Sequence, residues 1–198
     1  MITSVDYQRV LTPMFPDNEQ APLTSAKQLK IVAISSERAH GLNLLWHSRM
    51  PRLDCYNICS PCYCAYYDNL IYAVALWSLP IAANRLINGT KLLELRRLAI
   101  AEDAPKFTAT RMLSLMAKDI SRNRPDILRL ISYQDTGVHT GTIYKAANWT
   151  IERTSEYQSW GIHSQRPGQI EQSQSPKVRW GFPLCKSTNR AKPPEAKS

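Results

Sequence analysis

The chain has 198 residues, of which 43% are hydrophobic and 21% charged, and its formal net charge is +9 at pH 7. This length and apolar content suffice for one buried core and show no second core-forming block, so we expect a single domain. No window approaches about 18 uninterrupted apolar residues, and the first ten residues lack the charged-then-apolar order of a secretory signal. These observations argue against a membrane or secreted protein and predict a soluble intracellular one.

The basic charge predicts a polyanion as partner, because Lys and Arg gain affinity for phosphates by releasing condensed counterions. A basic protein without such a partner is the alternative. The last 48 residues carry eight basic residues against four acidic ones, interleaved with Tyr and Trp. Basic groups among aromatic rings favour nucleic acid, through phosphate pairing and base stacking. We therefore expect nucleic-acid contacts from Arg49, Arg153, Lys177 and Arg179.

Hydrophobic periodicity and turn signals predict an α/β order of strand, helix, three strands, helix, strand, helix, strand. In chain order the expected elements are a strand at 28–35, a helix at 36–50, a hairpin at 63–79 turning at Asp68-Asn69, a strand at 92–100, a helix at 108–122, a strand at 127–133, a helix at 139–147 and a strand at 149–153. We expect one more strand at 177–184, a flexible excursion at 161–175 and a disordered end at 192–198. The resulting domains are an irregular arm (1–27), a catalytic domain (28–156) and a basic, partly flexible extension (157–198).

The junction from Leu130 to Trp149 is the most polar strand-to-helix turn of the chain. It gathers proton-handling side chains within twelve residues, and chemistry is often placed where a strand ends and a helix begins. These side chains are Tyr133, Asp135, Thr136, His139, Thr140 and Tyr144. The sequence therefore predicts that the functional site lies at this turn.

The order of elements from Gln28 to Arg153 resembles the GNAT superfamily of N-acetyltransferases, which implies a mixed central sheet flanked by helices. In that fold the loop and helix after the fourth strand bind the pyrophosphate of coenzyme A through backbone N–H groups. The resemblance places this acyl-coenzyme A site at residues 104–111, with Lys106, Thr108, Thr110 and Arg111 as its polar groups, although the family's glycines are absent. An ordinary threonine-capped helix is the alternative here.

The segment Tyr144 to Trp149 (YKAANW) resembles the tyrosine-containing helix that follows the fifth GNAT strand. In such enzymes the tyrosine donates a proton to the departing thiolate, so the resemblance gives Tyr144 this role. Asn148 stands where the family has glycine, and Asn is the residue next most tolerant of a left-handed backbone. Tyr144 could instead be a plain helix-packing residue.

Three spaced segments look more specifically like the Mom family of phage DNA-modification proteins, a divergent branch of the GNAT fold. They are residues 93–99 (LELRRLA), 110–113 (TRML) and 132–144 (SYQDTGVHTGTIY). That family attaches a carbamoylmethyl group to the exocyclic amine of adenine in phage DNA, which protects the DNA from host restriction enzymes. The resemblance implies a phage-encoded enzyme acting on double-stranded DNA in the host cytoplasm, and it leaves a homodimer open.

Carried over residue by residue, this resemblance points to Arg96 or Arg97 on the strand and to His47 near the end of the first helix. The family's His-Tyr-Ser-basic element reads His47-Ser48-Arg49 here, without the tyrosine. A histidine facing the carbonyls of its own helix end is the alternative for His47.

Adenine's exocyclic amine is a poor nucleophile, because its lone pair is delocalised into the ring, so an enzyme must orient it beside a base. We expect Asp135 to be the base or amine acceptor. His139, whose ordinary pKa lies near neutrality, is expected to relay the proton.

Four cysteines fall within ten residues: Cys55, Cys59, Cys62 and Cys64. In a reducing cytoplasm such a cluster suggests a metal ion (iron or zinc) or an iron–sulfur cluster, although the spacing matches no standard zinc ribbon. The alternative is that Cys62 and Cys64 face the core as small hydrophobic residues.

Two other functions stay open. One is a GNAT acetyltransferase that uses acetyl-coenzyme A on a protein or small amine, and the other is a non-catalytic nucleic-acid-binding protein that reuses the fold.

Overall fold

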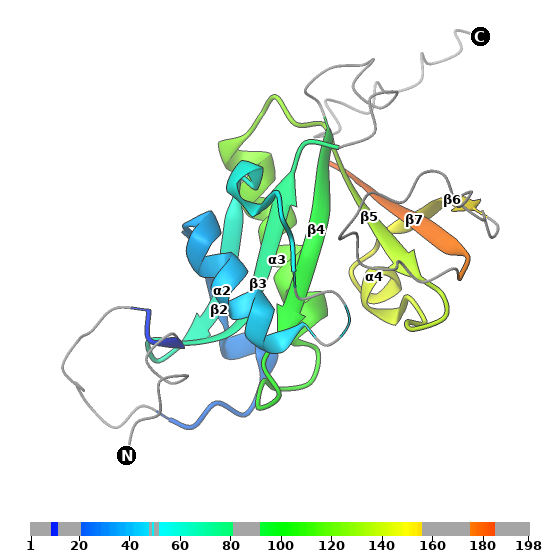
Figure 1. Ribbon diagram of the computed structural model, residues 1–198. Coiled ribbons are helices and arrows are strands. Elements are labelled where there is room, and N and C mark those ends of the chain that lie inside the picture. The colour runs from blue at the N-terminus through cyan, green and yellow to red at the C-terminus, as the bar shows by residue number, and fades with distance from the viewer. Residues whose placement is uncertain are drawn as a thin grey trace, which may run out of the picture.

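Seven strands form one mixed sheet in the order β1-β2-β3-β4-β5-β7-β6 (Figure 1). The computed structural model describes residues 9–11, 21–47, 49, 52–80, 92–155 and 175–184. Within these residues no helix is long and apolar enough to cross a membrane. The α/β architecture predicted from the sequence is confirmed.

The strands and helices of the described residues follow the predicted order. They are β1 (Lys30–Ile34), α2 (Ser36–Trp46), β2 (Cys62–Tyr67), β3 (Leu70–Ser78), β4 (Leu92–Ile100), α3 (Thr108–Asn123), β5 (Arg129–Asp135), α4 (Thr142–Ala146), β6 (Thr150–Ser155) and β7 (Lys177–Pro183), with single 3-10 turns at Ala26–Gln28 and Tyr56–Ile58. The predicted hairpin turn is confirmed, because Asp68 and Asn69 adopt φ values of 44° and 61°.

Several element ends differ from the prediction, and three of them bear on the site. Helix α2 ends at Trp46 rather than near residue 50, because the next residue, His47, is extended (φ −84°, ψ 104°). Helix α4 begins at Thr142 rather than at residue 139, because Gly141 has a left-handed φ of 74°. Strand β5 runs on to Asp135, so this aspartate ends a strand instead of lying in the turn.

The sheet extends beyond the predicted domain boundary at residue 156. Strand β7 pairs with β5 on one side and with β6 on the other, both antiparallel, so it is an inner strand of the sheet. The expected strand at 177–184 is thereby confirmed. The expected disordered end at 192–198 and nearly all of the excursion at 161–175 lie outside the described residues.

Helices cover both faces of the sheet: α2 lies in front of it in Figure 1 and α3 behind it. Helix α3 buries Met112, Leu113, Met116 and Ile120 in the largest core cluster, as its apolar periodicity predicts. Helix α2 packs Ala39 and Leu42 on the opposite face.

Strands β4 and β5 run parallel but stay together for only four residue pairs, from Leu92↔Arg129 to Leu95↔Ser132. Beyond this point they separate, as Figure 1 shows. A bulge marks the same place: on the β3 side, Leu95 pairs with Trp77 and Arg97 with Leu76, so Arg96 is the extra residue. We call the region beyond Leu95 and Ser132 the β4–β5 gap.

We predict that Leu113→Ala lowers the free energy of unfolding by about 2–5 kcal/mol, because Leu113 is fully buried in the α3 core and its removal leaves a cavity. Leu128→Ala is the matched control, since Leu128 is 42% exposed, and it should cost less than about 1 kcal/mol. Urea unfolding of both variants measures this. Equal stabilities would contradict the assignment of this cluster as the main core.

Candidate active site

One row of residues crosses the sheet at the closed end of the β4–β5 gap. Trp77 pairs with Leu95, Leu95 with Ser132, and Ser132 with Trp180. Neighbouring residues in a sheet point to the same face, and all but Ser132 belong to the core cluster under α3. The row therefore forms an apolar floor with one hydroxyl, Ser132, at the point where the two strands part.

The phenol of Tyr144 forms a hydrogen bond with this hydroxyl. Its oxygen lies 2.8 Å from Ser132 Oγ, and either oxygen can donate the hydrogen bond. Its ring stacks on Trp180, with centroids 5.4 Å apart, and is tilted against Trp149 at 5.7 Å. Burial raises the pKa of Tyr144, although the bond to Ser132 acts in the opposite direction. The phenol is therefore protonated at neutral pH, as a proton donor must be.

Two left-handed residues fix this tyrosine at the site. Gly141, just before α4, has φ 74°, and a Cβ there would lie 2.5 Å from Gln134 Oε1 and 2.7 Å from the Trp180 ring, so only glycine fits. Asn148, after the helix, has φ 61°, which confirms the left-handed turn expected from its place in the sequence.

Asp135 does not lie beside Tyr144. Side chains alternate along a strand, so Asp135 and Tyr133 face the side of β5 opposite to Ser132 and Gln134. Its carboxylate accepts from Lys177 Nζ at 2.6 Å and from Gly137 N–H at 3.0 Å. The predicted base is thus held by a cation on one face of the sheet, while the predicted acid lies on the other face.

His47 and His139 come from distant segments and lie close enough to interact. Burial lowers the pKa of His47, and the charges of Arg97 and His139 lower it further. His139 is exposed in the loop before α4, where its backbone N–H donates to Asp135 O at 3.0 Å. Arg49, also exposed, donates its backbone N–H to His47 Nδ1 at 3.4 Å. The structure therefore brings two of the predicted catalytic residues and one predicted nucleic-acid residue together.

At the bulge, the side chains of Arg96 and Arg97 contact different partners. Arg97 donates to Arg96 O at 2.7 Å and to Arg52 O at 3.2 Å, and burial lowers its pKa. Arg96 reaches Glu94 at 3.5 Å and Ser78 Oγ at 3.5 Å. The charge of Arg97 lowers the pKa of His47 and of His40.

The predicted nucleic-acid residues Arg153, Lys177 and Arg179 share one face of the sheet. Arg153 pairs with Arg179 across β6 and β7, and Asp135 pairs with Lys177, so these side chains point to the same side as Asp135. Arg179 is 3.1 Å from Glu152, which also accepts from Arg129 Nε at 2.6 Å. We call Arg129, Arg153, Lys177 and Arg179 the basic face.

The start of α3 offers groups suited to an anion. Among the described residues no side chain caps this helix, and Thr108 N–H donates to Pro105 O at 3.3 Å, so the first-turn amides of Ala109 and Thr110 are the remaining donors. Lys106 is exposed nearby, and Arg111 Nε is buried without a hydrogen-bond partner in the described part of the chain. The pyrophosphate of coenzyme A fits this set of donors.

Two further residues shape this helix start. The Thr108 hydroxyl, a predicted phosphate group, donates to Pro105 O at 2.7 Å. Phe107 supplies the left-handed backbone that glycine usually gives a phosphate loop, with φ 70° and a side chain that is 77% exposed. No sequence signal marks a phenylalanine for that conformation.

The four clustered cysteines do not meet at one point. Cys59 and Cys62 lie in one small core cluster with Cys55 against it, whereas Cys64 lies in another with Leu42 and Val74. Burial raises the pKa of the Cys62 and Cys64 thiols to about 12, as expected of the hydrophobic alternative. Within the described residues no group of three or more His, Cys, Asp or Glu side chains is arranged to hold a metal ion. The predicted metal site therefore gains no support.

Ser132 and Trp180 build the site but were not predicted as site residues. A serine in the apolar run of β5 is the one signal that could have singled out Ser132, because a buried hydroxyl needs a partner. Trp180 reads as an ordinary core residue in the sequence. Trp149 can be read from the sequence either as a residue that stacks on the flipped base or as a core residue, and the structure buries it in the core.

Comparison with known proteins gives one family and one fold. A model of the Mom protein family matches residues 63–191. No curated protein matches the chain. The family match covers β2 through β7 and so includes both faces of the gap.

Three solved structures resemble the chain at low sequence identity. The ribosomal-protein-S18-alanine N-acetyltransferase from Escherichia coli has a TM-score of 0.56 at 8% identity, over 83% of this chain and 99% of that one. IAA acetyltransferase from Bacillus cereus has a TM-score of 0.53 at 14% identity, over 78% of this chain and 99% of that one. A GNAT family acetyltransferase from Elizabethkingia anophelis with acetyl-CoA bound has a TM-score of 0.52 at 15% identity, over 79% of this chain and 98% of that one. The chain therefore has the GNAT fold.

We predict that His47 makes the protein less stable in acid. A histidine whose pKa is lowered on folding binds fewer protons in the folded than in the unfolded state, so stability falls as the pH drops below the ordinary histidine pKa of about 6.5. Urea unfolding from about pH 8 to about pH 5 should show a smaller loss for His47→Gln. His40, whose pKa is also lowered by burial, should account for a remaining slope. An unchanged slope in His47→Gln would contradict this account.

Proposed function

This chain belongs to the Mom protein family, and on that basis we propose that it is a DNA-modification enzyme that transfers a small acyl-type group, carbamoylmethyl, to the exocyclic amine of adenine. The modified phage DNA is then protected from host restriction. The structural observation that carries a transfer reaction, rather than binding alone, is the protonated phenol of Tyr144 on Ser132 at the β4–β5 gap.

The donor side of the site is the face covered by α3 and α4. A coenzyme A derivative, when bound, would supply the activated group, whose CH2 carbon bonds to the adenine nitrogen as the coenzyme A sulfur leaves, and the amides of Ala109 and Thr110 with Lys106 and Arg111 would hold its phosphates. Tyr144 holds a proton at its phenol oxygen, which it can give to a leaving group. The stacked ring of Trp180 keeps water from the phenol.

The acceptor side is the opposite face, where Asp135 lies, with His47 beside Arg97. Asp135 accepts hydrogen bonds and is fixed by Lys177, so it can orient an amine, which is what the weakly nucleophilic adenine N6 needs. His139, in the loop that leads from Asp135 to α4, would carry a proton away. Beyond Ser132 the β4–β5 ladder no longer separates the two faces.

The basic face would bind the phosphates of the DNA backbone beside this acceptor side. Lys177 and Arg179 are partly exposed on β7, the strand that pairs with that of Asp135, and Arg153 is exposed on β6, one strand further. An adenine in duplex DNA must leave the stack to be modified, at a cost of a few kcal/mol, and phosphate contacts offset that cost. This arrangement supports double-stranded DNA as the partner.

The second candidate is an acetyltransferase acting on a protein or small amine, which the acetyltransferase names of the structural neighbours favour. Binding of acetyl-coenzyme A without any DNA affinity would favour it. A non-catalytic DNA-binding protein would instead keep its full biological effect in Asp135→Ala and Tyr144→Phe variants.

We predict a modified deoxyadenosine in DNA from cells that make this protein. Tyr144→Phe should lower its amount by about a hundredfold or more, because the phenyl ring keeps the packing but has no proton to give. Nucleoside digestion and mass spectrometry measure the product.

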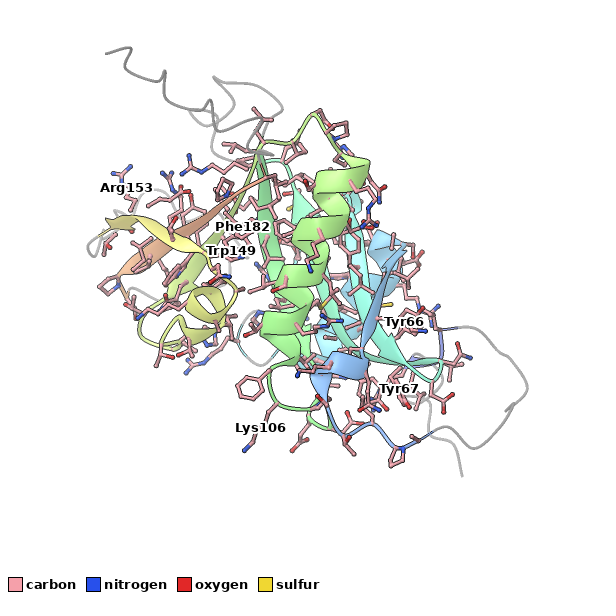
Figure 2. All side chains as sticks on the ribbon, turned by 180° about the vertical axis from the view of Figure 1, so that it is seen from behind. Tyr66, Tyr67, Lys106, Trp149, Arg153 and Phe182 are labelled. Carbon is pink, nitrogen blue, oxygen red and sulfur yellow. The ribbon has the colours of Figure 1, made fainter. Side chains whose placement is uncertain are left out.

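Tyr66→Phe is the matched control, because Tyr66 lies on the other side of α3 from Trp149 and Phe182 (Figure 2), and it should leave the product unchanged. Unmodified adenine with the original protein, in cells that also carry the phage's other genes, would contradict the proposal.

We also predict that Arg153→Gln weakens DNA binding about equally for all sequences and lowers the slope of log affinity against log salt by about 1, because one phosphate contact is lost. Arg122→Gln, at the exposed end of α3, is the charge-matched control and should leave the slope unchanged. Fluorescence anisotropy with duplex DNA measures both. Equal effects of the two variants would mean that net charge, not the basic face, binds DNA.

A further inference from the structure

Trp149 lies at the centre of the aromatic cluster beside the gap. It is 4% exposed, and its ring is 5.7 Å from Tyr144, 5.8 Å from Phe182 and 6.4 Å from Trp77, measured between centroids. Figure 2 shows Trp149 and Phe182 next to each other on one side of α3. The indole therefore contacts a ring from β3, on one side of the gap, and a ring from β7, on the other side.

The indole N–H of Trp149 is buried and has no hydrogen-bond acceptor among the described residues. The two other tryptophans of this cluster are satisfied: Trp77 Nε1 donates to Met116 Sδ at 3.2 Å, and Trp180 Nε1 donates to Gln134 Oε1 at 2.7 Å. Buried indole donors nearly always find a partner. The acceptor for this donor, which lies beside the candidate proton donor, is therefore a water or a ligand atom.

The surroundings define which ligand group suits this donor. The described ring partners of Trp149 are aromatic, and the phenol of Tyr144 is neutral because its pKa is raised. A charged carboxylate or phosphate would be costly to bury in such a cluster, whereas a neutral carbonyl oxygen accepts a hydrogen bond at little cost. Trp149 belongs to the core cluster on the α3 side, which is the donor side and not the side of Asp135.

We propose that the indole N–H of Trp149 donates a hydrogen bond to the neutral carbonyl oxygen of the group to be transferred, and so helps to select the acyl donor. The inference rests on the proposed function, because it assumes that an acyl donor binds on this face. Trp149 would then be a binding residue that places the carbonyl beside Tyr144, and the ladder of three aromatic contacts would hold the indole in position.

The test compares acetyl-coenzyme A with coenzyme A, which lacks the carbonyl, on the full chain. In a ¹H–¹⁵N spectrum the indole signal of Trp149, assigned through its contacts with Phe182, should move downfield with acetyl-coenzyme A and stay in place with coenzyme A. The signals of Trp77 and Trp180 are internal controls, because their N–H groups already have acceptors.

Trp149→Phe gives a second, independent measurement. It removes the donor and keeps an aromatic ring, so it should weaken acetyl-coenzyme A binding by about two- to tenfold and leave the affinity for coenzyme A unchanged. Trp180→Phe is the structural comparison: it leaves Gln134 Oε1 without its donor and should lower the unfolding temperature more than the loss of the indole N–H at Trp149 does.

Two results would overturn the inference, and they have different consequences for the proposed function. If acetyl-coenzyme A binds and moves other signals but leaves the Trp149 indole in place, the inference fails and the proposed function stands. If neither compound binds, the acyl-coenzyme A donor fails, and the inference fails with it.

Discussion

The rest of the site depends on the brevity of the contact between β4 and β5. Four residue pairs hold the two parallel strands together, and the bulge at Arg96 marks the point where they part. Had the ladder continued, hydrogen bonds would close the sheet and separate its two faces. The ladder stops at Leu95 and Ser132, and the proposed function has side chains above and below the sheet serve one reaction at this point.

Each face then supplies a different kind of chemistry. The α3 side holds apolar, neutral groups: the Tyr144 phenol, the Ser132 hydroxyl and the indole rings. The opposite side holds charged and titratable groups, with Asp135 paired to Lys177 and with His47 near Arg97. A neutral acyl group and a nucleotide in polyanionic DNA need opposite environments, so this division suits a transfer between them.

The sequence predicted the elements well where local signals are strong. The amphipathic pattern of α3, the Asp68-Asn69 turn and the left-handed Asn148 are all local features, and all are confirmed. The sequence could not show that Asp135 and Tyr144 lie on opposite faces, because this depends on where β5 ends, and the turn had been expected to begin before Asp135. Nor could it place β7 between β5 and β6, since strand order follows from tertiary packing. Phe107 in a left-handed conformation breaks the rule that such positions favour glycine.

Mapping the two ligands separately tests the division of labour between the faces most directly. Backbone ¹H–¹⁵N shifts would be recorded once with acetyl-coenzyme A and once with a short adenine-containing duplex. We expect acetyl-coenzyme A to move the amides at the start of α3 and in α4, the duplex to move those of β6 and β7, and both sets to meet at Ser132 to Asp135. A duplex that moves the α3 face, or two ligands that move the same residues, would contradict this account.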